Sequence, residues 1–227
     1  MMKHFWVVGT DTDVGKTFVT TLFLRELQKN GHTVTPYKPV QTGLVADTEL
    51  GHYQDTSSYK EYSLYSLDND SLSTYSFPIA ASPHYAAELA GQQIDENMLL
   101  QTIEHLKTKF ETVICEGAGG LYVPLHSSTT RTLLDVVEVS KLPVVLVAST
   151  KLGTINHTLL SIEALHARGI SVQGIVFNQF NQTPLEQNNI DTIRRFTGLP
   201  SAVIEANRTI ESFTDVPVLE GLMSNDV

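Results

Sequence analysis

A stretch that could bind a phosphate chain lies near the start of the sequence. GTDTDVGKT begins at Gly9 and ends in a Gly-Lys-Thr tripeptide. In a phosphate-binding loop, backbone N–H groups and the lysine hold phosphates, and the hydroxyl after the lysine coordinates magnesium. The usual spacing, G-x-x-x-x-G-K-[ST], would put the first glycine at position 10, where this chain has Thr10. The motif therefore indicates an altered phosphate loop, and the alternative is an ordinary strand-to-helix turn.

The neighbouring segments favour phosphate binding. The apolar run at 4–8 is typical of a strand buried on both faces. Apolar residues then recur at helical spacing from Lys16 until Gly31, which is a typical helix terminator. A turn between such elements directs backbone N–H groups and the positive end of the helix at one point. Lys16 would reach the β- and γ-phosphates, and the hydroxyl of Thr17 would bind magnesium.

Two carboxylates and a second lysine could complete a site for phosphoryl transfer, which needs acids at the ends of neighbouring strands. Glu116 follows the apolar run TVIC, and ligands of open α/β sheets bind at such strand ends. Asp55 lies in a poorly patterned stretch and could equally cap a surface helix. Lys38 follows the predicted second strand and could point toward Lys16, or it could be a solvated strand-end lysine.

Strand-like and helix-like segments alternate along the chain, which predicts an α/β fold with three layers. Its mostly parallel central sheet should carry helices on both faces. The predicted strands are 4–8, 33–37, 112–115, 143–148 and 171–178. One predicted helix starts at Lys16, and four others cover 82–90, 95–110, 132–140 and 155–167. The stretch 44–77 predicts a loop with a short helix.

Composition narrows the class of protein. With 227 residues, 41% of them hydrophobic and 18% charged, we expect one globular domain spanning 1–227. A net charge of -10 argues against nucleic-acid and membrane partners, which carry negative charge themselves. The single cysteine, Cys115, excludes an internal disulfide, and its apolar neighbours predict a buried thiol. Apolar runs are too short for a membrane span or a signal peptide, so we expect a cytoplasmic protein.

Taken in order, the motifs resemble those of the dethiobiotin synthetase family. They are GTDTDVGKT, KPVQTG, SPHYAAE, CEGAGGLYVPL and TKLGTINHTLLS, with FNQ after them. The resemblance implies a P-loop NTPase-like fold. It also implies an ATP-dependent cyclo-ligase of biotin biosynthesis that makes dethiobiotin from 7,8-diaminononanoate and carbon dioxide. The implied steps are carbamate formation, transfer of the γ-phosphate to the carbamate, and ring closure with loss of phosphate.

The resemblance also implies roles for individual residues, with Lys16 and Lys38 as the catalytic ones. Nucleotide would be bound by Thr12, Asp13, Val14, Gly15, Lys16, Thr17, Glu116, Gly119 and Asn178, of which Asn178 would contact the base. Magnesium would be held by Thr17, Asp55 and Glu116. Substrate would contact Thr12, Lys38, Thr42, Gly153, Thr154, Ile155 and Asn156. The last four residues open a predicted helix whose N-terminus could bind the substrate's carboxylate, and in the family this segment serves the neighbouring subunit, which implies a homodimer.

Two other classes of protein share parts of this pattern. A partitioning-type ATPase that dimerises on ATP would carry a lysine early in the loop, where this chain has Asp11 and Thr12. An amidase of the cobyrinic acid type would need a glutaminase domain with a nucleophilic cysteine. The segment GLPSAVIEANRT departs from the family's usual Gly-x-Ile-Pro pattern, which leaves the nucleotide preference and the roles of Glu205 and Asn207 open.

Overall fold

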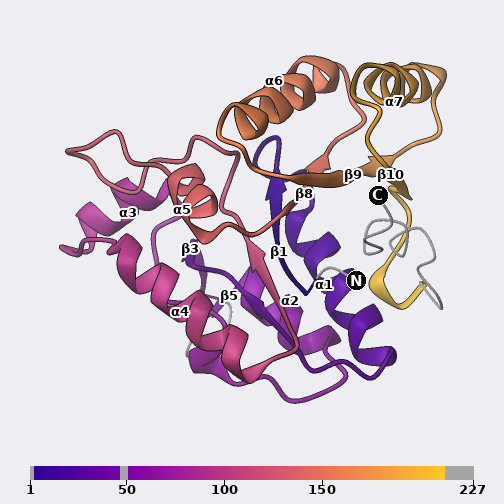
Figure 1. Cartoon of the computed structure of the whole chain (residues 1–227). Helices are drawn as coiled ribbons and strands as arrows, with labels where there is room; N and C mark the ends of the chain where they lie inside the picture. Colours follow the sequence, from indigo (N-terminus) through magenta and orange to yellow (C-terminus); the bar gives the residue numbers. More distant parts are fainter. Residues whose placement is uncertain (1–2, 47–50, 213–227) are drawn as a thin grey trace.

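A six-stranded parallel sheet forms the centre of the molecule (Figure 1). The computed structural model describes residues 3–46 and 51–212. The strands lie in the order β10-β9-β8-β1-β7-β2, and each neighbouring pair runs parallel. Their bounds are β1 (His4–Gly9), β2 (Val34–Tyr37), β7 (Thr112–Glu116), β8 (Val144–Ala148), β9 (Val172–Phe180) and β10 (Ser201–Glu205). Because β1 lies between β7 and β8, the chain changes direction across the sheet at β1, the usual place for a ligand in such folds.

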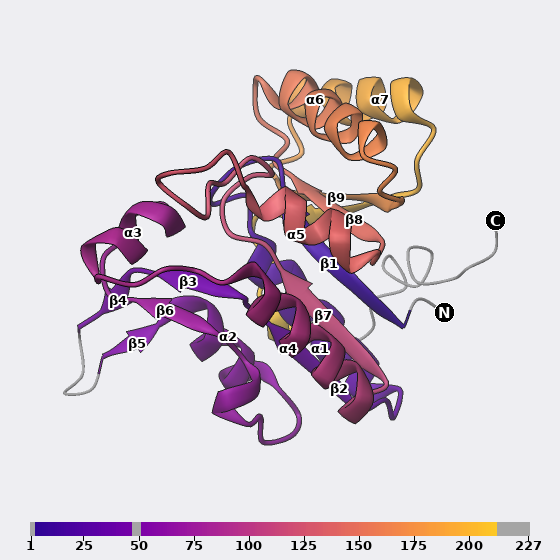
Figure 2. The ribbon, with the colours of Figure 1, turned by 60° about the vertical axis from the view of Figure 1, so that its left-hand side comes forward.

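Helices cover both faces of the sheet (Figure 2), as the alternation of the sequence predicted. Side chains of β1 alternate between the two cores: Phe5 and Val7 pack on one face, and Trp6 and Val8 on the other. The face of Phe5 carries α1 (Lys16–Lys29) and α2 (Gln54–Tyr62). The face of Trp6 carries α3 (Pro83–Leu89), α4 (Glu96–Lys109), α5 (Leu133–Ser140), α6 (Thr154–Ala167) and α7 (Pro184–Thr197). None of the helices in the described ranges is long and apolar enough to span a membrane.

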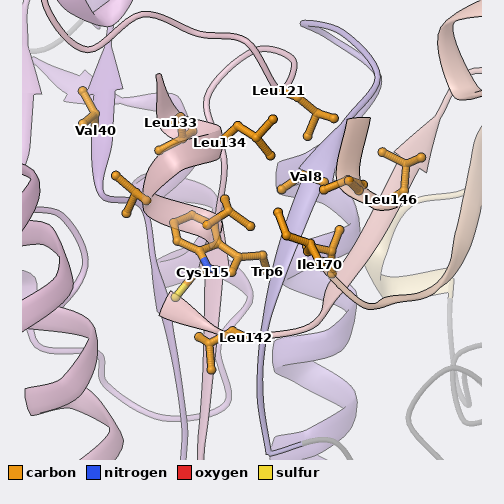
Figure 3. Close-up of a cluster of buried hydrophobic side chains, with 14 of the residues drawn as sticks. Trp6, Val8, Val40, Cys115, Leu121, Leu133, Leu134, Leu142, Leu146 and Ile170 are labelled. Carbon is orange, nitrogen blue, oxygen red and sulfur yellow. The ribbon is translucent and has the colours of Figure 1, made fainter. Parts of the chain in front are cut away.

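The core on the Trp6 face shows how apolar burial and polar satisfaction are combined (Figure 3). Trp6 is fully buried and lies beside Cys115 of β7. Its indole N–H donates a 2.9 Å hydrogen bond to Ser140 Oγ at the end of α5, so the one polar atom of the ring has a partner. Burial raises the pKa of the Cys115 thiol. The prediction that Cys115 is a core residue is confirmed.

The stretch from 44 to 77 contains more regular structure than the sequence predicted. Besides α2 it holds the short strands β4 (Leu44–Val45), β5 (His52–Tyr53) and β6 (Tyr75–Phe77), and the 3-10 helix η1 (Asn69–Ser71). β6 pairs in parallel with β3 (Val40–Thr42), and β4 pairs antiparallel with β5. Strands of two or three residues are too short to show a period of two in the sequence, so the pattern gave no sign of them.

The C-terminal part of the described chain adds elements that the sequence did not predict. These are α7, the sixth strand β10, and the 3-10 helix η2 (Ile210–Ser212), which packs against α1. A capping box starts α7, in which Thr183 and Glu186 each accept a hydrogen bond from the other's backbone N–H. The sequence carries the motif for this box, Thr-Pro-x-Glu, at 183–186.

Glu186 is a buried acceptor that joins three segments. It is 5% exposed, and its carboxylate accepts hydrogen bonds from Thr150 Oγ1 at 2.8 Å, from Asn181 Nδ2 and N at 3.0 Å, and from Thr183 Oγ1 at 3.0 Å. Burial alone would raise the pKa of Glu186, but these donors outweigh it and lower the pKa to about 2. The charged carboxylate therefore fixes the loop after β8 to the start of α7.

We expect Glu186→Gln to destabilise the fold by about 2 kcal/mol at pH 7, because the new amide places a donor where the carboxylate accepts. The folded-state pKa lies below the ordinary 4.5, so this stabilisation is complete above pH 4.5 and is lost as the pH falls toward 2. Urea unfolding at pH 7 and at pH 3 measures both effects, with the exposed Glu163→Gln as control. If the free energy of unfolding of Glu186→Gln differs from that of wild type by the same amount at both pH values, this explanation is wrong.

Candidate active site

The predicted chemistry-bearing residues meet at the carboxyl edge of the sheet. In the register, Val7 of β1 pairs with Glu116 of β7, and Tyr37 of β2 pairs with Cys115. The loop after β1, Lys38 after β2, and Glu116 are therefore neighbours. A cavity of about 720 Å³ opens beside them. Among the predicted site residues, its lining includes Thr12, Asp13, Gly15, Lys16, Thr17, Lys38, Thr42, Asp55, Glu116 and Gly119.

The structure explains the early glycine of the phosphate loop. A Cβ atom on Gly9 would lie 2.9 Å from the carbonyl oxygen of Asp11 and from Val14 Cγ2, and 3.0 Å from Lys16 Cδ. The loop therefore folds back over the last residue of β1, and the stem of Lys16 crosses it. Only glycine leaves room for that approach. The glycine stands at position 9 because the closest packing occurs there.

The far side of the loop rests on the end of β9. Gly15 has a φ of 90°, in the left-handed region, and a Cβ atom there would come within 2.0 Å of Asn178 Nδ2. Asn178 Nδ2 donates a 3.0 Å hydrogen bond to the carbonyl oxygen of Val14, and Gln179 Nε2 donates one of 3.2 Å to that of Asp13. Two side chains of β9 thus hold the loop in shape from behind.

Lys16 is buried beside the cavity and bonds to the loop itself. Its ammonium donates a 2.9 Å hydrogen bond to the backbone carbonyl of Asp11, and the residue is 6% exposed. Burial lowers the pKa of Lys16 to about 8, and repulsion from Lys38 adds to the effect. Binding of an anion would stabilise the charged form of this buried ammonium, because the anion would replace the water that burial has removed.

Three oxygen atoms converge at the start of α1. Thr17 Oγ1 lies 2.5 Å from Asp55 Oδ1 and 2.8 Å from Glu116 Oε1, and its single proton cannot serve both carboxylates. Adjacent ligands of an octahedral site with bonds of 2.0–2.1 Å stand about 2.9 Å apart. The chemistry and the spacing of these oxygens therefore fit a small divalent cation. Within residues 3–46 and 51–212, no group of three or more His, Cys, Asp or Glu side chains could hold a metal ion.

Lys38 is held between the same two acids. Its ammonium lies 2.7 Å from Glu116 Oε1 and 2.8 Å from Asp55 Oδ2, and it donates a third hydrogen bond of 3.0 Å to the carbonyl of Gly117. Burial alone would lower the pKa of Lys38, but the carboxylates of Glu116 and Asp55 raise it above its usual value. Lys38 therefore stays charged, and the same attraction lowers the pKa of Asp55 against the effect of its burial.

Other predicted site residues lie outside the lining of this cavity. Val14 is buried under the loop, and Asn178 lies behind it. Gly153, Thr154, Ile155 and Asn156 form the start of α6, where Thr154 Oγ1 donates to the carbonyl of Ser149. Glu205 and Asn207 do not line the cavity either, whereas Thr209 and Ile210 do. The C-terminal part of the described chain thus contacts the cavity through Thr209 and Ile210.

Sequence reasoning missed several residues that surround the acids. Tyr59 of α2 is fully buried, and its hydroxyl donates to Glu116 Oε2. Tyr59 itself does not line the cavity, whereas other missed residues do: Gln41, Tyr53, Gln54, Ser58, Tyr62 and Gln179. A helical spacing of four between Asp55 and Tyr59 was the available signal, since it puts both side chains on the same face of α2.

Comparisons with known proteins identify the family of the chain. A family model described as an AAA domain matches residues 3–225. An ATP-dependent dethiobiotin synthetase of Lysinibacillus sphaericus is 57% identical over 215 residues, which is 95% of this chain and 91% of the relative. One from Halalkalibacterium halodurans is 40% identical over 204 residues, covering 88% of this chain and 83% of the relative.

The chain belongs to the ATP-dependent dethiobiotin synthetase family. This family consists of ligases, so the chain is an ATP-dependent enzyme acting on small molecules. Solved structures show a similar fold. The septum site-determining protein MinD of Pyrococcus horikoshii, solved with Mg-ADP, has a TM-score of 0.58 and covers 98% of this chain and 86% of its own. At 15% identity, this likeness shows a shared fold alone.

For this dethiobiotin synthetase family member, we expect Asn178→Ala to weaken the binding of ADP and of inorganic triphosphate alike, by about five- to tenfold. The reason is that the amide holds the phosphate loop through Val14, and triphosphate has no base. Isothermal titration of both ligands measures the change, with the exposed Asn188→Ala as control. A loss confined to ADP would instead indicate the base contact that the resemblance implied.

Proposed function

We propose that the whole chain, residues 1–227, is one synthetase domain that converts 7,8-diaminononanoate, carbon dioxide and ATP into dethiobiotin, ADP and phosphate. The main support is the 57% identity to a named synthetase over 95% of the chain. The supporting geometry is a single cavity that brings together the phosphate loop, Lys38 and the acids Asp55 and Glu116. A ligase that activates one substrate with ATP needs these groups within reach of the same phosphate.

The proposed reaction has three steps. One amine of the substrate adds to carbon dioxide and loses a proton, which gives a carbamate. A carbamate oxygen attacks the γ-phosphorus of ATP, and the bond from this phosphorus to the β,γ-bridging oxygen breaks as ADP leaves. The second amine then attacks the carbonyl carbon of the carbamic-phosphoric anhydride, loses its proton and expels inorganic phosphate, closing the ureido ring.

Lys16 and Lys38 would stabilise the charge that develops during phosphoryl transfer. Lys16, at the start of α1, would bind the β- and γ-phosphates, because its buried ammonium lies in the cavity lining at the positive end of this helix. Lys38, together with Thr42 and Thr12 in the cavity lining, would contact the carbamate and the transferring phosphoryl group. The acids that flank Lys38 keep it charged for this role.

The cation of this site would be Mg²⁺, bound by Thr17, Asp55 and Glu116. When bound, Mg²⁺ neutralises charge on the β- and γ-phosphates. Thr17 and both acids present oxygen atoms, which are the ligands that Mg²⁺ prefers. Asp13 and Thr12, also in the lining, would lie toward the amines of the substrate.

The substrate's carboxylate would bind at the N-terminus of α6 in a second copy of the chain. Gly153, Thr154, Ile155 and Asn156 lie away from the cavity of their own chain, so they would serve a neighbour. Leu152 beside them is 85% exposed, which suits a contact between subunits. We therefore propose a homodimer with shared sites, located in the cytoplasm, without nucleic-acid or membrane partners.

One experiment tests the activity directly. The protein is incubated with 7,8-diaminononanoate, bicarbonate and MgATP, and the products are analysed by mass spectrometry. We expect dethiobiotin and ADP in equal amounts, with no dethiobiotin when the diamine, bicarbonate or ATP is left out. Release of ADP without dethiobiotin would refute the proposed function.

We expect Lys38→Ala to lower kcat by about 100-fold or more while nucleotide binding is retained, because Lys38 acts on the transferring group and Lys16 holds the phosphates. Steady-state kinetics and titration with ADP in the presence of Mg²⁺ separate the two effects. The exposed Lys60→Ala on α2 is the matched control. Unchanged turnover in Lys38→Ala would remove this lysine from the reaction.

We expect the active species to be a dimer, since the proposed carboxylate site comes from a second chain. Sedimentation velocity at the concentration of the activity assay measures the oligomeric state. An exposed charge at the contact, Leu152→Asp, should shift the protein toward monomer and raise KM for the diamine. A monomer with full activity would disprove the shared site.

A further inference from the structure

Tyr59 connects α2 to the end of β7 inside the protein. The residue is fully buried in the core on the Phe5 face, among apolar side chains that include Phe23 and Leu72. Its hydroxyl donates a hydrogen bond to Glu116 Oε2. A tyrosine at this place can contact neither solvent nor substrate, because it is absent from the lining of the cavity and 0% exposed. Its polar atom therefore acts on Glu116.

The two oxygens of Glu116 have different neighbours. Oε1 accepts from Thr17 at 2.8 Å and from Lys38 at 2.7 Å, on the side of the cavity. Oε2 accepts from Tyr59, on the side of the core. The terminal torsion of a glutamate is soft, so the partners of its oxygens decide which way the carboxylate is turned. The hydrogen bond from Tyr59 on the core side therefore fixes this torsion.

We infer that Tyr59 is a positioning residue that holds Glu116 in the orientation needed to bind the divalent cation, and this inference rests on the cation site of the proposed function. Mutation of a residue that hydrogen-bonds to a metal ligand commonly lowers metal affinity by about 10–100-fold. The same helix carries Asp55 one turn earlier, 2.5 Å from Thr17 Oγ1. One rigid helix thus supplies one ligand directly and orients another.

Tyr59→Phe tests this role because it removes the hydroxyl and keeps the ring in the core. The probe is Mn²⁺, titrated into the full-length protein with saturating ADP and followed by the electron paramagnetic resonance signal of the free ion. We expect Tyr59→Phe to bind Mn²⁺ about tenfold more weakly or worse. Affinity for ADP in the presence of EDTA should not change, since Tyr59 does not contact the phosphate loop.

Tyr37→Phe is the matched control. Tyr37 is also fully buried, and its hydroxyl lies 2.5 Å from Thr74 Oγ1, away from the acids. Its loss should leave the Mn²⁺ affinity at the wild-type value. In a Glu116→Gln background, adding Tyr59→Phe should cause little further loss, because the group that Tyr59 orients is already altered. Tyr59→Leu provides a second variant without the hydroxyl if Tyr59→Phe does not fold.

The outcomes separate this inference from the proposed function. If Asp55→Asn weakens Mn²⁺ binding but Tyr59→Phe does not, the positioning role is wrong and the cation site stands. If Asp55→Asn and Tyr59→Phe both leave Mn²⁺ binding unchanged, the cation site itself is wrong. Equal losses of ADP affinity in EDTA and of Mn²⁺ affinity would show a general structural effect and overturn the positioning role.

Discussion

The buried carboxylate of Glu116 is the constraint on which the arrangement of this site depends. It is 0% exposed at the carboxyl end of β7, and a charged group so placed is costly unless donors and cations surround it. Its partners are Thr17 at the start of α1, Lys38 after β2, and Tyr59 on α2. Each comes from a different element. Compensating this one charge therefore brings together the elements that a phosphoryl-transfer site needs.

The two lysines of the site differ because their surroundings differ. Lys38 lies between two carboxylates, which raise its pKa despite its burial. Lys16 bonds to a backbone carbonyl, and burial lowers its pKa to about 8. The charge of Lys38 is thus satisfied within the protein, whereas Lys16 has most to gain from a phosphate. In the proposed reaction, Lys16 would therefore hold the nucleotide and Lys38 would stabilise the transferred group.

The sequence predicted the layers of the fold and the charged residues at the strand ends of the cavity, and it did so for a physical reason. Strands buried on both faces give continuous apolar runs, and the residue after such a strand must lie at the sheet edge, which located Lys38 and Glu116. Asp55 could not be located in this way, because it belongs to a short polar helix between strands of two or three residues. Tyr59 was missed because only tertiary packing brings its hydroxyl to Glu116.

The irregular spacing of the phosphate loop follows from close packing against the Cα atom of Gly9. The missing Cβ of Gly9 is what allows the stem of Lys16 and the side chain of Val14 to cross the end of β1. With the glycine there, the next residues are free to carry side chains, and Asp13 takes a left-handed φ of 58° that directs the chain back toward Gly15. Thr12 and Asp13 then face the cavity next to the phosphate site. The loop thus brings an anionic side chain, Asp13, into the cavity that also holds Lys16 and Lys38, and in the proposed reaction this carboxylate would attract the amines of the substrate.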